Sequence, residues 1–194
     1  MKDQKSIHIK NMVCNRCIMV VDQIFQQAGL ETASISLGEV KLAADSVSAD
    51  KLSALDSLLL KHGFERIDDR KSQLLEQIKA AVIDAIHHHE NFEVNINWSH
   101  YLSDKLNYDY NYLSSLFSSV TGITLEQYII RQKVEKVKEF LFYDELSVKE
   151  IAYKLGYSSV AHLSSQFKKI TGLTPTEFKE SRQTDIRTPL DNII

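Results

Sequence analysis

The sequence has few residues that cross-link a chain or break its secondary structure. It has only two cysteines, Cys14 and Cys17, and this excludes a disulfide scaffold. Its two prolines, Pro175 and Pro189, both lie near the C-terminal end. Regular secondary structure can therefore run through most of the chain with few interruptions.

Long apolar runs and an excess of charge of one sign are also missing. No apolar run approaches the roughly 18–20 residues of a membrane-spanning helix, and the polar first ten residues lack the apolar segment of a secretory signal. We therefore expect a cytoplasmic protein with no membrane partner. The 23 Lys and Arg residues against 26 Asp and Glu residues require any nucleic-acid binding to come from a local face.

The 194 residues allow one domain or two small ones, and the first seventy predict a small α+β domain. Residues 6–10 alternate like a strand, and apolar spacing predicts a helix over 18–28. Residues 33–42 read as a hairpin, residues 52–62 as a second helix and residues 64–68 as a last strand. This β-α-β-β-α-β order is that of the ferredoxin-like fold, with two helices on one face of the sheet.

The two cysteines lie where the first strand meets the first helix. A helix N-terminus offers backbone N–H groups and partial positive charge, both of which lower a thiol pKa, and Arg16 should add to this effect. Two thiolates spaced C-x-x-C make a soft site with few ligands, which suits Cu(I). Cys14 and Cys17 are therefore the candidate metal ligands.

This arrangement resembles the heavy-metal-associated domain of copper chaperones and metal-pumping ATPases. Met12, Cys14 and Cys17 match its M-x-C-x-x-C motif, and the resemblance covers about residues 5–69. It implies binding of Cu(I) or another soft or borderline metal ion. The family usually has glycine where this chain has Asn11.

In that family the loop before the last strand lies beside the metal loop, which here would be Gly63-Phe64. Three other interpretations of the cysteines remain open. They are a redox dithiol, a closed zinc site, which would need four ligands, and incidental cysteines in a domain that binds something else.

A charged stretch at residues 68–71 marks a domain boundary. Apolar spacing then predicts an amphipathic helix from Leu74 to His88. His87, His88 and His89 are adjacent, so they point about 100° apart on a helix and make a poor chelate.

An internal repeat dominates the rest of the chain. The stretch LSSLFSSVTGIT begins at Leu113 and LSSQFKKITGLT begins at Leu163, fifty residues later. Upstream, Asn107 and Gly156 occupy matching positions, and both residue types tolerate left-handed backbone. A short helix, a sharp turn and a second helix make a helix-turn-helix unit, so we expect two such units in an all-α domain.

A long helix, Leu125–Phe142, should join the two units and hold them about one DNA turn apart. We expect its polar face to carry Arg131, Lys133, Lys136 and Lys138. The tyrosines at 108, 110 and 112 are predicted to be core and phosphate-edge residues rather than a stacking platform.

The two repeats strongly resemble the DNA-binding domain of AraC/XylS regulators over about residues 72–180. The resemblance implies recognition helices near Tyr110–Val120 and Ser159–Ile170. The side chains expected to face DNA are those outside the buried stripes: Asn111, Ser114, Ser115, Ser118, Ser159, His162, Ser165, Gln166 and Lys169. The family often has arginine at the positions of Ser115 and Ser165.

These features together predict a bacterial two-domain transcription regulator that is not an enzyme. Residues 1–70 would be a metal sensor, 71–181 the DNA-binding domain and 182–194 a flexible tail. Duplex DNA is the expected partner, with a second copy of the chain and RNA polymerase as further candidates. The alternatives are a metal-independent regulator that dimerises through the N-terminal domain and a cytoplasmic metal carrier or buffer.

Overall fold

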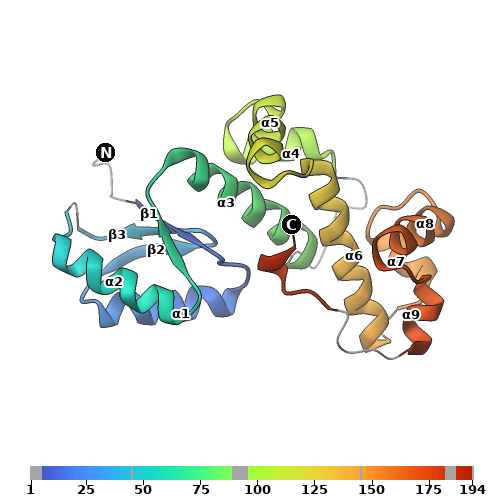
Figure 1. The fold of residues 1–194 in the computed structure, drawn as a ribbon, viewed down its shortest axis with the longest axis horizontal. Helices are drawn as coiled ribbons and strands as arrows, with labels where there is room; N and C mark the ends of the chain where they lie inside the picture. Colours follow the sequence, from blue (N-terminus) through green and yellow to red (C-terminus); the bar gives the residue numbers. More distant parts are fainter. Residues whose placement is uncertain (1–5, 45, 89–95, 145, 182–186, 194) are drawn as a thin grey trace. The chain divides into compact units, whose positions relative to one another are not determined.

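The computed structural model describes residues 6–44, 46–88, 96–144, 146–181 and 187–193 (Figure 1). The chain divides into two compact units, Met1–Ala80 and Ala81–Ile194, and each is treated separately below. The boundary lies about ten residues after the predicted position at 70/71, because one continuous helix runs through it.

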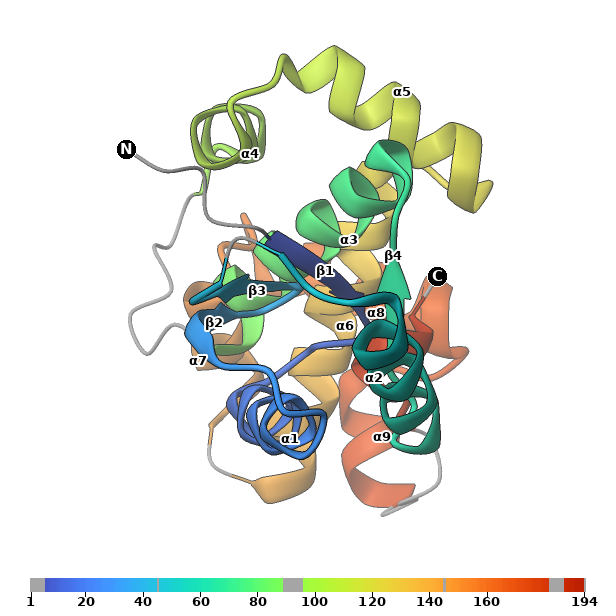
Figure 2. The same cartoon turned by 90° about the vertical axis from the view of Figure 1, so that its left-hand side faces the viewer.

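The first unit has the predicted β-α-β-β-α-β order. Its elements are β1 (Ser6–Lys10), α1 (Asn15–Gln27), β2 (Thr32–Ser36), β3 (Glu39–Leu42), α2 (Ala49–Lys61) and β4 (Glu65–Ile67). The strands form one antiparallel sheet in the order β2-β3-β1-β4. The two helices lie side by side on one face of this sheet (Figure 2). Fully buried apolar side chains such as Ile9, Phe25 and Leu55 fill the space between the sheet and the helices.

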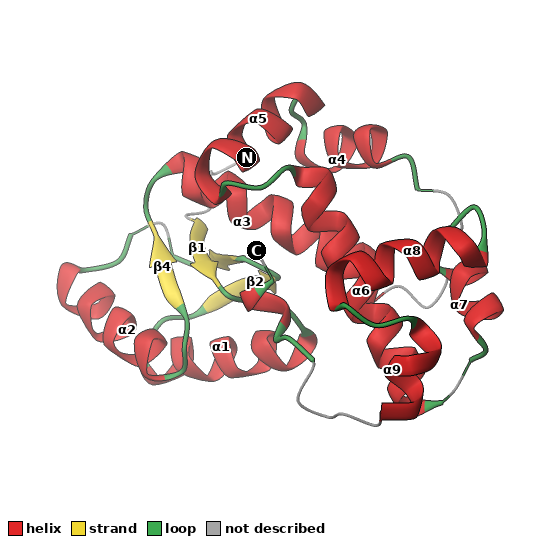
Figure 3. Cartoon of the chain, turned by 45° about the vertical axis from the view of Figure 1, so that its right-hand side comes forward, coloured by secondary structure: helices red, strands yellow, loops and turns green. Residues whose placement is uncertain are grey.

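Helices make up nearly all of the regular structure from residue 70 onward (Figure 3). They are α3 (Arg70–Ile83) with a π-helical last turn η1 (Asp84–His88), α4 (Trp98–Leu106), α5 (Tyr110–Thr121), α6 (Leu125–Tyr143), α7 (Val148–Lys154), α8 (Val160–Thr171), α9 (Pro175–Ser181) and the 3₁₀ turn η3 (Leu190–Asn192). The predicted helix from Leu74 to His88 thus begins four residues earlier and ends as a π-helix.

The internal repeat corresponds to two copies of one structural unit. Leu113 and Phe117 in α5, and Leu163 and Phe167 in α8, are all completely buried. They anchor each helix to its own core, since apolar side chains four residues apart share one helical face. The predicted helix-turn-helix pairs are therefore α4–α5 and α7–α8.

The T-G-x-T part of the repeat ends one helix and begins the next. Gly122 ends α5 with φ of +76°, where a side chain would be strained, and the hydroxyl of Thr121 donates to the carbonyl of Phe117 at 2.8 Å. Thr124 then caps α6, accepting from the backbone N–H of Gln127 at 3.1 Å. The second copy repeats this geometry, and the predicted left-handed turns are confirmed at Asn107 (φ +57°) and Gly156 (φ +66°).

Helix α6 is the centre of the second unit and contacts α5, α7, α8, α9 and η1. Because it is covered on most sides, its lysines do not form the exposed polar face that the sequence predicted. Lys138 is buried and pairs with Glu135 at 2.5 Å, and Lys133 donates to the carbonyl of Leu155 at 2.9 Å. These long side chains run along the packing surfaces and have their charged ends beside protein oxygen atoms.

The C-terminal segment, residues 187–193, packs against α6, where the sequence predicted a flexible tail. The backbone N–H of Thr188 donates to Glu135 and the side-chain amide of Gln132 donates to the carbonyl of Leu190, each at 3.2 Å. Ile193 is buried. Two inward-facing polar side chains of α6 thus hold the segment's backbone.

Candidate functional site

Helix α5 presents a neutral polar surface. Asn111 and Ser115 are exposed, whereas Ser114 and Ser118 are partly buried. The hydroxyl of Ser114 donates to the carbonyl of Asn111 at 3.1 Å, and that of Ser118 donates to the carbonyl of Ser114 at 2.7 Å. These two hydroxyl protons are therefore used within the helix. No lysine or arginine lies between Tyr110 and Thr121.

Helix α8 presents a surface with more hydrogen-bonding and charged groups. Ser159 is its N-cap and accepts from the backbone N–H of His162 at 3.1 Å. The imidazole of His162 is exposed, with Nδ1 bonded to the hydroxyl of Ser158 at 3.0 Å. Ser165 and Lys169 are also exposed, and Gln166 is partly buried. The nine predicted DNA-facing residues thus fall on two helices, at capping or at least partly exposed positions.

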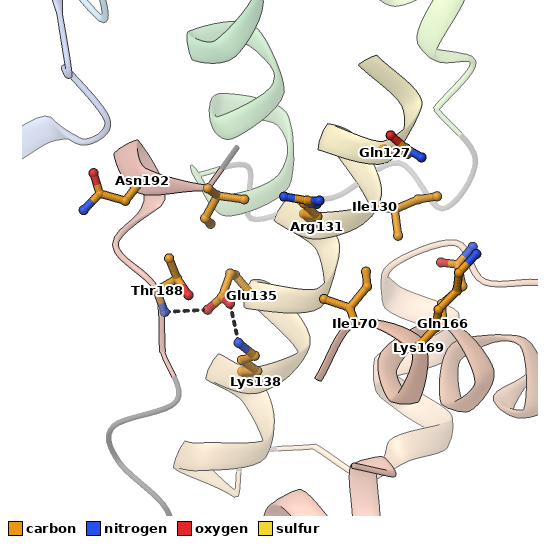
Figure 4. A pocket seen from close by; sticks show the side chains of 11 residues that line it. Gln127, Ile130, Arg131, Glu135, Lys138, Gln166, Lys169, Ile170, Thr188 and Asn192 are labelled. Carbon is orange, nitrogen blue, oxygen red and sulfur yellow. Dashed lines mark hydrogen bonds and ion pairs between the residues drawn. The ribbon is translucent and has the colours of Figure 1, made fainter. Parts of the chain in front are cut away.

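Gln166 and Lys169 also line a groove of about 600 Å³ between α8, α6 and the C-terminal segment (Figure 4). The remaining lining residues are Gln127, Ile130, Arg131, Glu135, Lys138, Ile170, Thr188, Asn192 and Ile193. Three cations and one carboxylate give this groove a net positive charge. The sequence singled out Gln166, Lys169, Arg131 and Lys138 but not the C-terminal wall, which depends on contacts between distant residues.

The aromatic residues before and within α5 differ from one another in burial. Tyr110 is partly buried, and burial raises its pKa, with Glu126 adding to the shift. Tyr108 and Tyr112 are instead 48% and 47% exposed and stack on each other, with ring centroids 5.7 Å apart. These two rings are surface residues.

The two cysteines lie together at the start of α1. Cys14 is the N-cap residue, and its carbonyl accepts from the backbone N–H of Cys17 at 2.9 Å. The two Sγ atoms are 3.5 Å apart and both side chains are partly exposed. One ion can therefore reach both sulfur atoms, since metal–sulfur bonds are about 2.3 Å long.

The two thiols are not equivalent. Burial alone would raise the pKa of Cys14, but hydrogen bonds from Cys17 and, to a smaller extent, from Arg16 together lower that pKa. Burial and the neighbouring Cys14 sulfur raise the pKa of Cys17, although a helix N-terminus was expected to lower both. Cys14 is thus the sulfur that ionises first.

The loop before the cysteines explains the one departure from the metal-domain motif. Asn11 has φ of +71°, a left-handed conformation that glycine and asparagine both tolerate. Its side-chain amide donates to the carbonyl of Gly63 at 2.9 Å, so the loop before β4 lies beside the cysteine loop. The side chain of Met12 is buried in the core of the first unit and so fixes this loop to the core.

The described parts of the chain contain no larger cluster of metal-ligating side chains. No group of three or more His, Cys, Asp or Glu side chains is suitably placed there to hold a metal ion. His87 turns inward and donates from Nε2 to Gln132 at 3.0 Å, and His89 lies outside the described residues. Among the described helices, none has the length and apolar character needed to cross a bilayer.

Comparison with known families identifies the region that contains both helix pairs. A family model described as a helix-turn-helix domain matches residues 102–181, from within α4 to the end of α9. Residues 102–181 are therefore similar to a helix-turn-helix domain. The match to this helix-turn-helix domain includes every predicted DNA-facing residue and none of the first unit.

Several curated relatives support the assignment of the helix-turn-helix domain. The HTH-type transcriptional regulator YtdP of Bacillus subtilis is 28% identical over 119 residues, which are 61% of this chain and 15% of YtdP. The transcriptional regulatory protein YesN of the same species is 34% identical over 94 residues, 47% of this chain and 25% of YesN. The transcriptional activator RhaS of Escherichia coli is 27% identical over 93 residues, 48% of this chain and 33% of RhaS. The chain thus spans at most a third of these relatives.

A solved structure shares the fold of the helix-turn-helix domain. The C-terminal domain of AraT, a response regulator from Geobacillus stearothermophilus, superimposes with a TM-score of 0.50 at 24% identity. The superposition covers 62% of this chain and 94% of that domain.

Proposed function

We propose that the chain is a sequence-specific DNA-binding transcription regulator that uses α5 and α8 as recognition helices. The observation that carries this proposal is the duplication itself. Two helix-turn-helix pairs with matching caps and matching buried residues are joined by the single helix α6. Each pair suits one major-groove segment, and α6 holds the two helices at a fixed separation.

The two recognition helices should contribute unequally to DNA binding. Helix α5 has no cation, whereas α8 ends with exposed Lys168 and Lys169 and borders a positively charged groove. Cations that neutralise phosphates provide the part of the affinity that depends on salt. We therefore propose that the half-site bound by α8 contributes more of the affinity.

The test is selection of a preferred duplex with the full chain, followed by binding measurements at several salt concentrations. Lys169→Ala should weaken binding to all sequences about equally and reduce the salt slope by about one unit, because one phosphate cation is lost. Lys61→Ala, at an exposed position on α2, is the matched control and should change neither. A Lys169→Ala protein with the parent's salt slope would contradict this assignment, and no preferred duplex for the parent would contradict the proposed function.

We also propose that the first unit is a ferredoxin-like domain of the heavy-metal-associated type that binds one soft metal ion. Cys14 and Cys17 would hold the ion, and the proposal is supported by the 3.5 Å separation of their sulfur atoms. The bond from Asn11 to Gly63 adds support, since it joins the two loops that the resemblance expects to be adjacent. A soft cation would be bound by both sulfur atoms as thiolates, so the two thiols would release their protons when the ion binds.

The reduced protein should bind about one Cu(I) ion per chain through the cysteine pair. Binding should tighten as the pH rises, because the raised pKa of Cys17 leaves a proton that the metal must displace. Competition with a Cu(I) chelator measures the affinity, and the variant with both Cys14→Ser and Cys17→Ser should lose tight binding. A single Ser36→Ala replacement at an exposed β2 position is the control. Unchanged Cu(I) affinity in the double variant would place the site elsewhere.

Metal regulation of DNA binding requires that the ion favour one DNA-binding state over another. The measurement is DNA affinity with and without Cu(I), for the parent and the double cysteine variant. A Cu(I)-dependent change only in the parent supports a metal-responsive regulator. Metal binding without a change in DNA affinity supports the metal-independent regulator, and metal binding with no preferred duplex supports the carrier. A second copy of the chain and RNA polymerase remain predicted partners.

A further inference from the structure

The first recognition helix has few groups with which to bind the DNA backbone. Its central serines, Ser114 and Ser118, donate to their own helix, and it carries no lysine or arginine. The preceding turn adds Asp109, whose carboxylate accepts from the backbone N–H groups of Asn111 and Tyr112. A helix that contacts an anionic backbone needs donors, and Asn111 and Ser115 are the exposed predicted donors on α5, so a further donor beside them would add to the contact.

The stacked pair of Tyr108 and Tyr112 lies at the start of this helix. Tyr108 belongs to the turn, directly after the left-handed Asn107, and Tyr112 belongs to the first turn of α5. The rings are tilted by 27° and remain about half exposed. Stacking places the ring of Tyr108 against the ring of Tyr112, so a change at one ring should alter the orientation of the other.

The second helix-turn-helix unit contains an equivalent pair of rings. Tyr157 matches Tyr108 at an offset of 49 residues, and His162 matches Tyr112 at an offset of 50. Tyr157 and His162 also contact each other, with centroids 5.4 Å apart and planes at 83°. In both copies, a tyrosine from the turn therefore packs on a hydrogen-bonding ring in the first turn of the recognition helix.

The two rings of the second pair differ in exposure. The hydroxyl of Tyr157 is buried without a hydrogen-bond partner in the described structure, and Lys133 lies over its ring at 5.5 Å. His162 is exposed, and Ser158, the extra residue of this longer turn, bonds its Nδ1. The turn tyrosine therefore supports the ring, and the helix residue faces outward.

We infer that Tyr112 and His162 are equivalent DNA-backbone contacts, one on each recognition helix, and that Tyr108 is the positioning residue for Tyr112. The phenol of Tyr112 donates its O–H to a phosphate oxygen beside the N-terminus of α5. Tyrosine is one of the side chains that make such contacts. The inference rests on the proposed DNA binding. It gives α5, which has no lysine or arginine, an uncharged side chain that binds a phosphate.

The test uses the full chain and its selected duplex. Tyr112→Phe removes one hydroxyl and should weaken binding about 10-fold, the effect of losing one hydrogen bond to a charged group. The loss should be equal for matched and mismatched duplexes, because a phosphate contact reads no sequence. The salt slope should stay unchanged because a phenol displaces no counterion. Tyr112→His, which copies the second unit, should bind more tightly than Tyr112→Phe.

Two further replacements separate positioning from direct contact. Tyr108→Phe keeps the stacked ring and should stay within about twofold of the parent, whereas Tyr108→Ala should bind as weakly as Tyr112→Phe. The matched control is Tyr153→Phe, because Tyr153 lies on α7 and is 71% exposed. It should leave binding unchanged. Circular dichroism should show that all variants are folded.

Each outcome is decisive. Parent-like binding by Tyr112→Phe overturns the inference, even where Lys169→Ala still reduces the salt slope and thereby upholds the proposed function. If Tyr112→Phe lost affinity only for duplexes with one particular base pair at one position, Tyr112 would contact a base. That result would also overturn the inference. A Tyr108→Phe defect as large as that of Tyr108→Ala would make Tyr108 a contact and not a positioning residue. Absence of DNA binding by the parent overturns both proposals.

Discussion

Phe167→Ala should destabilise the helix-turn-helix domain by about 3–5 kcal/mol, the usual cost of truncating a fully buried phenylalanine. Phe167 has no exposed surface and meets Phe178 of α9 edge to face, with ring centroids 5.4 Å apart. The variant would lose the transfer free energy of the ring and leave a cavity between α6, α8 and α9. Urea denaturation monitored by circular dichroism measures the change in the free energy of unfolding.

The repeat provides a matched comparison for this variant. Phe117 occupies the same position in the first copy and packs on Tyr128 at 5.0 Å, so Phe117→Ala should have a similar cost. Phe142, on the same protein but 44% exposed, is the control, and Phe142→Ala should cost no more than about 0.5 kcal/mol. Equal unfolding free energies for Phe167→Ala and Phe142→Ala would contradict the assignment of Phe167 to the core.

Acidification should destabilise the protein through His87. Burial, with a contribution from the nearby Lys136 charge, lowers the pKa of His87 to about 4, although its bond to Gln132 acts in the opposite direction. Between about pH 4 and pH ~6.5, His87 is therefore neutral in the folded state but protonated in the unfolded state. The resulting loss of stability is absent above pH ~6.5 and grows to about 3 kcal/mol as the pH falls toward 4.

His87→Gln removes this titration and keeps a side chain that can bond to Gln132. The free energy of unfolding, measured between pH 7 and pH 4, should fall less steeply for this variant than for the parent. Subtracting the two curves removes the contribution of carboxylates that titrate in the same range. His100→Gln, at an exposed position on α4, is the control. A parallel fall in the parent and His87→Gln would show that other groups cause the acid sensitivity.

Local signals in the sequence predicted much of the second unit. Each residue of the repeat has a role that depends mainly on its neighbours along the chain. Phe117 and Phe167 recur on a helical face, Gly122 adopts the left-handed conformation, and Thr124 caps the next helix. Those requirements involve spacings of three or four residues, so they can be read directly from the sequence.

Features that depend on distant residues could not be predicted in this way. The C-terminal segment docks because Gln132 meets the carbonyl of Leu190, 58 residues away, and no local pattern marks that contact. Lys133 and Lys138 looked like solvent-facing charges until α6 proved to be covered on most sides. The predicted metal ligands and DNA-facing residues stay predictions, because exposure and spacing agree with their roles but do not show the ligand.

If α5 and α8 are the recognition helices, as proposed, helix α6 also restricts how the DNA target could change. Its 19 residues form one uninterrupted helix, about 28 Å long at 1.5 Å per residue, which can neither stretch nor rotate as a flexible linker would. One inserted base pair between two half-sites would turn the second by about 35° around the DNA axis. Base substitutions in such a spacer would leave this alignment intact, whereas insertions and deletions would destroy it. Related target sites should therefore share one spacer length, even where the spacer sequence varies freely.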